Sequence, residues 1–180
     1  MAKRVTLLRH AKSSWDDPVL RDFDRPLNRR GARAARTVGR EMRALGLAFD
    51  AVIVSPAARA VETLAGIEEG YGGSLGAARD ERVYLATPDL LLELVHETDG
   101  AAQSLLILGH NPGLHQFALR LGSEEGEKGL RGELLAKYPT ASLAEIEFET
   151  DNWHDVRFGG GCLTRFVRPR DLDPELGPGR

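Results

Sequence analysis

The sequence has little cysteine, since Cys162 is the only one among 180 residues. A disulfide within the chain and a zinc site built from several cysteines are therefore both excluded. We expect Cys162 to be a small buried side chain next to the glycines at 159–161. A chain with one cysteine fits a reducing compartment, and we predict a cytoplasmic location.

The sequence also lacks long apolar runs and an excess of positive charge. Its first apolar run is too short for a secretory signal, because Arg9 and His10 interrupt it, and no other run approaches the length of a membrane span. The formal net charge is -3, so no overall basic character points to nucleic acid. With 42% hydrophobic and 28% charged residues, the composition predicts a globular protein without membrane or nucleic-acid partners.

Apolar runs and amphipathic stretches alternate along the chain. This alternation predicts an α/β fold of three αβα layers, with a central, mostly parallel sheet. We predict one domain over residues 1–170 and a flexible tail over 171–180, which is rich in Pro, Gly and charge. The segment 142–149 alternates imperfectly and is expected to be a strand with one exposed face.

A helix is predicted from Asn28, a good N-cap, to the region of Gly46. One of its faces is apolar and the other is basic. A solvated basic face is favoured over a surface for an acidic partner, although the sequence leaves both open. The basic face comprises Arg29, Arg30, Arg33, Arg36, Arg40 and Arg43.

The stretch Val5–Asp16 begins as a buried strand and ends abruptly in Arg9 and His10. Ligands gather at the carboxyl ends of strands in open α/β sheets. Arg9 offers forked donors to a phosphoryl group, and His10 offers an imidazole that can act as nucleophile or base. An ordinary solvated strand end is the alternative. The polar segment 12–25 that follows is expected to be a loop.

Two further strand ends carry comparable residues. Arg59 is predicted in the first turn of a helix, where the helix dipole disfavours a cation, so a bound anion or a plain surface position would explain it. His110 follows an apolar strand and precedes a helix N-terminus, which favours anions. His96, His115 and His154 show no metal-ligand spacing and are expected to have surface or packing roles. Arg9, His10, Arg59 and His110 together suit a phosphoryl group.

The three stretches Leu8–Ala11, Ser55–Thr63 and Gly109–Pro112 resemble the three motifs of the histidine phosphatase superfamily, which has the phosphoglycerate mutase-like fold. Within it, the chain is most similar to SixA-type phosphohistidine phosphatases. The residues that carry this likeness are Arg9–Ser13, Asp24–Leu27, His110–Pro112 and Lys137–Ala141.

The resemblance implies that His10 is the nucleophile that transiently carries the phosphoryl group. It implies that Arg9, Arg59 and His110 bind the phosphoryl oxygens and that Ser13 can touch phosphate. No metal and no organic cofactor is implied. The implied partners are phosphate and either a phosphorylated signalling protein, such as a histidine phosphotransfer domain, or a small phosphorylated substrate.

A proton donor is harder to place. Mutase and acid-phosphatase relatives use a carboxylic acid, but Glu81 is the nearest acid to Tyr84 and its register is wrong. Asp24 or Asp16 could serve instead. A site without an acid suits phosphohistidine, because imidazole leaves more readily than an alcohol. We therefore predict a phosphohistidine phosphatase. The alternatives are a phosphatase of small phosphate monoesters and a phosphate-binding or phosphoprotein-binding module without turnover.

Overall fold

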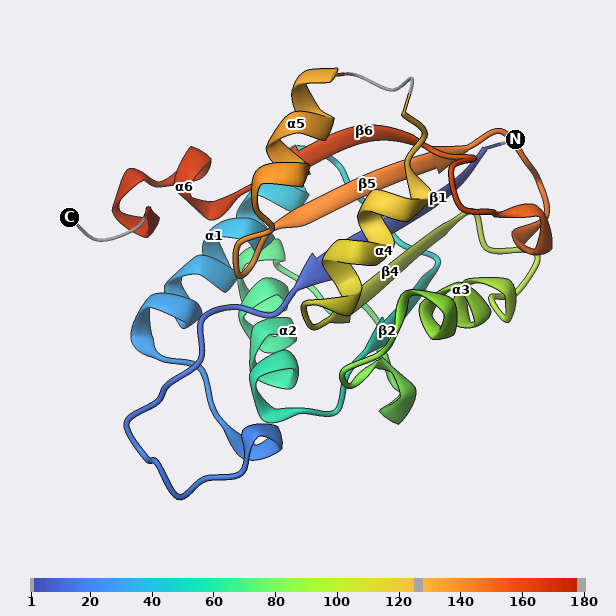
Figure 1. Cartoon of the computed structure of the whole chain (residues 1–180). Helices are drawn as coiled ribbons and strands as arrows, with labels where there is room; N and C mark the ends of the chain where they lie inside the picture. Colours follow the sequence, from blue (N-terminus) through green and yellow to red (C-terminus); the bar gives the residue numbers. More distant parts are fainter. Residues whose placement is uncertain (1, 125–127, 178–180) are drawn as a thin grey trace.

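A single six-stranded sheet forms the centre of the protein, as shown by a computed structural model that describes residues 2–124 and 128–177 (Figure 1). The strand order is β3-β2-β4-β1-β5-β6. Only β5 runs antiparallel to its neighbours, so the prediction of a mostly parallel sheet is confirmed. The strands are β1 (Lys3–Arg9), β2 (Ala51–Val54), β3 (Ala78–Arg79), β4 (Ser104–Gly109), β5 (Leu143–Phe148) and β6 (Cys162–Val167).

Helices cover both faces of the sheet, which gives the predicted three layers (Figure 1). One face buries a core beneath α1 and α2, and the other buries a core beneath α3 and α4. None of these helices is long and apolar enough to cross a bilayer. The helices of the described residues are α1 (Arg29–Ala44), α2 (Ala58–Tyr71), α3 (Pro88–His96), α4 (Gly113–Leu121), α5 (Lys128–Ala136) and α6 (Pro169–Leu172).

Helix α1 begins where the sequence predicts. The Asn28 side chain accepts a hydrogen bond from the backbone N–H of Gly31 at 2.8 Å, which satisfies one of the free donors of the first turn. Ala35, Val38 and Met42 are buried against the sheet, while most of the arginines point away from the core. The helix thus pairs a narrow apolar stripe with a broad basic face.

Two predictions about burial are wrong, one for a strand and one for Cys162. β5 has no exposed face, because it lies between β1 and β6 and sends its side chains into both cores. Its buried Glu145 is paired with Arg165 at 3.4 Å. Cys162 is exposed rather than buried, because it starts the edge strand β6 on the side that faces away from the core.

The segment predicted as a flexible tail is packed over residues 171–177. Arg33 of α1 forms ion pairs of 2.6 Å with both Asp173 and Glu175, and Leu172 and Leu176 pack against the core beneath α1. Composition alone missed this because two leucines and two acids are enough to dock a short segment onto a basic helix. Residues 178–180 of that tail lie outside the described residues.

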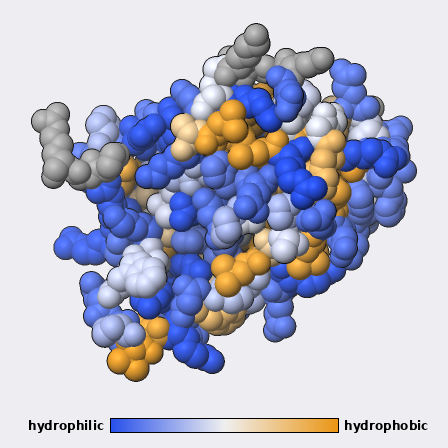
Figure 2. Space-filling model, in the orientation of Figure 1, coloured by the Kyte–Doolittle hydropathy of each residue, from blue (hydrophilic) through white to orange (hydrophobic). Residues whose placement is uncertain are grey.

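The face of the molecule seen in Figure 2 is mostly hydrophilic, and its apolar residues form small separate patches. Small patches of this kind are normal on a globular protein and do not by themselves mark an interface. The features that bear on function lie instead at the carboxyl ends of the central strands.

Candidate active site

Three neighbouring strands deliver polar side chains to one place. Arg9 is in register with Gly109 across β1 and β4, and the backbone N–H of His10 donates to the Gly109 carbonyl at 3.0 Å. The rings of His10 and His110, which follow these strands, therefore stand 5.1 Å apart between centroids. Ser55 follows β2 on the other side of β4 and reaches His110.

The protonation state of His10 follows from its partners. Its Nδ1 lies 2.7 Å from the Ala11 carbonyl oxygen, and because a carbonyl can only accept, Nδ1 carries the proton. Nε2 then carries no proton, and its lone pair accepts a hydrogen bond from Nε of Arg59 at 3.3 Å. Burial lowers the pKa of His10 to about 4, and Arg59 and Arg9 add to this effect. His10 is therefore a neutral imidazole with a nucleophilic nitrogen at neutral pH.

Arg59 lies in the first turn of α2, is buried, and has a carboxylate partner. Its Nη1 donates to the Asp22 carbonyl at 2.6 Å and its Nη2 to Asp22 Oδ2 at 2.9 Å. The Tyr84 hydroxyl donates to the same carboxylate oxygen at 2.6 Å. The Tyr84 hydrogen bond, followed by the bond from Arg59, lowers the pKa of Asp22 despite partial burial. The sequence predicts an anion at Arg59, and the anion beside Arg59 in this structure is the Asp22 carboxylate.

His110 is also held neutral. Burial lowers its pKa to about 3, and the nearby His10 and Arg59 add to the effect. Its Nε2 is 2.6 Å from the Ser55 hydroxyl oxygen. Its Nδ1 is buried without a hydrogen-bond partner within the described part of the chain. A buried polar atom without a partner is costly, so this nitrogen is available to a ligand.

Arg9 completes the group from the end of β1. Its Nη1 donates to the Tyr138 carbonyl at 2.9 Å, and its Nε is buried with no partner among the residues that the structure describes. Desolvation lowers the pKa of Arg9, but an arginine remains charged at neutral pH. Two guanidinium groups thus flank two neutral imidazoles.

Comparisons with known proteins place this site in a family. Residues 5–83 match the model of the histidine phosphatase superfamily (branch 1). An uncharacterized protein of Mycobacterium tuberculosis is 36% identical over 164 residues, which is 91% of this chain and 100% of that protein. The chain belongs to the histidine phosphatase superfamily.

Solved structures of this superfamily show the same architecture. A candidate phosphohistidine phosphatase SixA from Nakamurella multipartitia is 28% identical, covers 94% of this chain and 97% of its own, and superposes with a TM-score of 0.80. A second SixA candidate, from Agrobacterium tumefaciens, is 28% identical over 93% of this chain and 98% of its own, with a TM-score of 0.77. The fold is thus the phosphoglycerate mutase-like fold, and the protein is a phosphatase of the superfamily.

The remaining residues that the resemblance singled out lie in the segment between β1 and α1. Asp24 is bound by the Arg21 side chain at 2.8 Å, and Asp16 is exposed in the loop after β1. Ser13 forms an isolated bridge with Leu27 in the same loop. Among the described residues, no hydrogen bond or ion pair joins these three to His10, Arg59 or His110.

The carboxylate that does reach the site is Asp22, which sequence reasoning missed together with Ser55 and Tyr84. Asp22 opens a short 3-10 turn at Asp22–Asp24, and this turn presents Asp22 to Arg59 while Asp24 faces Arg21. The two acids are only two residues apart, so nothing in the composition of the loop could have separated them. Ser55 carried a clearer signal, since it directly follows a buried strand.

Of the other histidines, His96 and His115 lie against backbone carbonyls and His154 is exposed. His96 and His115 each contact a backbone carbonyl, those of Val156 at 2.9 Å and Leu134 at 2.6 Å. Within residues 2–124 and 128–177, no three His, Cys, Asp or Glu side chains come together in a way that could hold a metal ion.

Proposed function

We propose that the protein is a metal-independent phosphohistidine phosphatase that carries the phosphoryl group on His10 and acts on a phosphorylated signalling protein in the cytoplasm. The observation that carries this proposal is the state of His10. Its Nδ1 proton is fixed on the Ala11 carbonyl, and its neutral Nε2 faces the Arg59 guanidinium. Such a nitrogen is a nucleophile beside a cation that binds the group it attacks.

The proposed reaction has two displacements at phosphorus. In the first, the lone pair of His10 Nε2 forms an N–P bond, and the bond from phosphorus to the leaving group breaks with its electron pair on the leaving atom. In the second, water attacks phosphorus, the N–P bond breaks, and its electron pair returns to Nε2. The water protons end on the released phosphate or in solvent. Throughout, the Nδ1 proton stays on His10 and bonds the Ala11 carbonyl.

Fixed charges stabilise the transferring group in this scheme. Arg59 and Arg9 bind phosphoryl oxygens, and the phosphoryl group takes over the donor of Arg59 that the Asp22 carboxylate holds beforehand. The Ser55 hydroxyl accepts from the Ala57 N–H at 3.3 Å, so its own proton can be donated to Nε2 of His110. The His110 proton is then on Nδ1, a buried nitrogen to which no described residue bonds, and Nδ1 donates this proton's hydrogen bond to a phosphoryl oxygen.

The nature of the leaving group follows from the lack of a protonated acid among the described residues of the site. Asp22 is the carboxylate at Arg59, but its lowered pKa keeps it ionised, so it is a poor proton donor. An alcohol leaves with difficulty unless an acid protonates it, which is worth about 10²–10⁴-fold. Imidazole takes a proton from solvent readily, since its pKa is near 6.5. The names of the two SixA candidates support the same substrate class.

Two alternatives remain distinct. A phosphatase of small monoesters would need a neutral acid at the site, and Asp22 is the carboxylate placed to become one if a phosphoryl group displaced it from Arg59. A module that binds phosphate without turnover would keep the arginines but would not need His10.

The test is to trap the intermediate. The protein is mixed with phosphoramidate or a phosphohistidine-bearing protein, quenched in alkali, and digested for mass spectrometry. We expect a phosphoryl group on the peptide that contains His10, its absence in His10→Ala, and its retention in His154→Asn, which removes an exposed imidazole elsewhere. No adduct and no phosphate release from any donor would overturn the phosphatase proposal and favour the binding module.

A further inference from the structure

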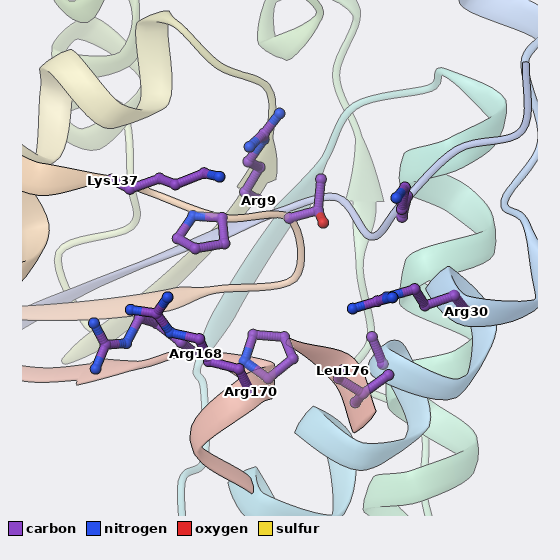
Figure 3. A pocket seen from close by; sticks show the side chains of 11 residues that line it. Arg9, Arg30, Lys137, Arg168, Arg170 and Leu176 are labelled. Carbon is purple, nitrogen blue, oxygen red and sulfur yellow. The ribbon is translucent and has the colours of Figure 1, made fainter. Parts of the chain in front are cut away.

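Next to the proposed nucleophile lies a pocket of which the reaction scheme uses only Arg9. It has a volume of about 420 Å³ and is bounded by the end of β1, the start of α1, the segment before β5, and α6 (Figure 3). Arg30 and Lys137 extend into it from opposite sides. Six cationic residues line it: Arg9, Lys12, Arg30, Lys137, Arg168 and Arg170.

The charge of this pocket is not balanced by the protein. Among the residues that the structure describes, no aspartate or glutamate lines it. Arg168 has carboxylate partners, Asp171 at 2.7 Å and Glu133 at 3.3 Å, but within the described residues the other five cations form no ion pair. Like charges gathered in one concave place raise the free energy until an anion enters.

Other arginines of α1 show that pairing is available to this helix. Arg33, one turn beyond Arg30, bonds Asp173 and Glu175, and Arg36 bonds Glu69. Arg30 instead points into the pocket, where it meets further cations (Figure 3). The basic face of α1 is thus not simply a solvated surface, because its first turn contributes to a concave cationic site.

The pocket is connected to the phosphoryl site. Arg9 lines it and is also one of the two cations that lower the pKa of His10. The wall at Lys137–Thr140 is tied to the same strand end, since the backbone N–H of Ala141 donates to the His10 carbonyl at 3.0 Å. A group seated in the pocket would therefore lie beside a phosphoryl group on His10.

We propose that this pocket binds carboxylate side chains that flank the phosphohistidine of the partner protein, so that the enzyme selects acidic phosphoproteins. This proposal rests on the proposed function. Carboxylates match the forked donors of Arg30 and Arg170, and the apolar wall formed by Ala34, Pro139 and Leu176 fits the methylene groups of Asp and Glu. Because the whole chain carries a net charge of -3, an acidic partner is repelled elsewhere and attracted here, which orients it.

The test compares two phosphohistidine peptides that differ only in their flanks, Asp and Glu in one and Asn and Gln in the other. Phosphoramidate, which has no carboxylate, measures phosphoryl transfer separately in each variant. We expect the wild type to prefer the acidic peptide by roughly tenfold in kcat/KM, with the preference falling as salt rises. In the double variant Arg30→Gln/Arg170→Gln the ratio falls toward one.

The matched control is Arg43→Gln, which removes the same charge from the exposed far end of α1, about 20 Å away along the helix. It should keep the wild-type ratio. The acidic-partner proposal would be overturned if the wild type turned over both peptides equally, or if the preference for the acidic peptide survived in the double variant. Turnover of phosphoramidate would still support the phosphatase in either case. Competitive inhibition by pyrophosphate without peptide preference would reassign the pocket to small polyanions. Failure of phosphoramidate as well would overturn the function itself.

Discussion

At the scale of single residues, Asp22 occupies the guanidinium of Arg59, which binds the phosphoryl group in the proposed reaction. It takes two hydrogen bonds from Arg59 through its backbone and side chain, so it competes with substrate for that cation. We expect Asp22→Asn to bind inorganic phosphate two- to tenfold more tightly, measured as a lower inhibition constant, and to keep phosphoramidate turnover. A fall of about 10²-fold or more in monoester turnover would instead identify Asp22 as a general acid.

Ser55 belongs to the same scale, as a positioning residue for His110. Its hydroxyl holds Nε2 of His110 at 2.6 Å and thereby sets which ring nitrogen carries the proton. Ser55→Ala should lower kcat for phosphoramidate by roughly 5- to 10-fold, because a net hydrogen bond is worth about 1 kcal/mol, and should change KM less.

The matched control for Ser55 is Ser142→Ala, another buried serine, whose hydroxyl has no partner in the part of the chain described. Its kcat should be close to the wild type. If both variants lost activity equally, the loss would reflect packing near the strand ends, and the orienting role of Ser55 would be wrong.

The predicted site residues that the structure brings together share one property. His10, Arg59 and His110 each come within a few residues of a strand end, where local pattern decides position, and the structure brings them together. Asp22 and Tyr84 reach the site from connecting segments whose path depends on tertiary packing, so no periodicity reveals them.

At the scale of elements, the close contact of α1 with α2 places Arg59. It is made by glycines: a Cβ on Gly39 would collide with the Ile67 carbonyl, and one on Gly70 with the Arg36 carbonyl. We expect Gly39→Ala to destabilise the protein by about 1–3 kcal/mol in urea unfolding, because neither backbone can yield without moving a helix. Turnover should fall with it, since α2 carries Arg59.

Gly132 in α5 provides the opposite case. A Cβ there has nothing within 4 Å, so Gly132→Ala should stabilise by about 0.5–1 kcal/mol, the ordinary helix preference for alanine. If both substitutions changed the free energy of unfolding equally, α1 and α2 could separate without cost. Their contact would then not fix the position of Arg59.

The sequence predicts an element correctly where neighbouring residues alone determine its structure. The cap at Asn28 and the buried strand that ends at Arg9 are confirmed because side-chain chemistry and apolar pattern decide them locally. The prediction fails at β5, since an acidic residue in the alternating pattern predicts an exposed face, whereas Arg165 on β6 pairs with Glu145 and allows its burial. That partner lies 20 residues away, beyond any local pattern.

At the scale of the whole molecule, the two neutral imidazoles make stability depend on pH. Burial lowers the pKa of His10 to about 4 and that of His110 to about 3, from 6.5. Below pH 6.5 the unfolded chain therefore binds protons that the folded chain does not, so unfolding becomes more favourable as the pH falls. The lowered pKa of His10 alone reduces the free energy of unfolding by up to about 3 kcal/mol between pH 6.5 and pH 4, at 1.36 kcal/mol per pKa unit.

Thermal unfolding between pH 7 and pH 5 measures this effect. Asp22, Asp50 and Asp80 have pKa values below 3.8 in the folded protein, so their stabilisation is lost only at lower pH and leaves this window to the histidines. The melting temperature of the wild type should fall steadily as the pH falls. The melting temperature of the double variant His10→Asn/His110→Asn should fall much less. Parallel curves would mean that folding leaves both histidines with their ordinary affinity for protons. The lowered pKa values, by which burial would keep both imidazoles neutral well below pH 6.5, would then be wrong.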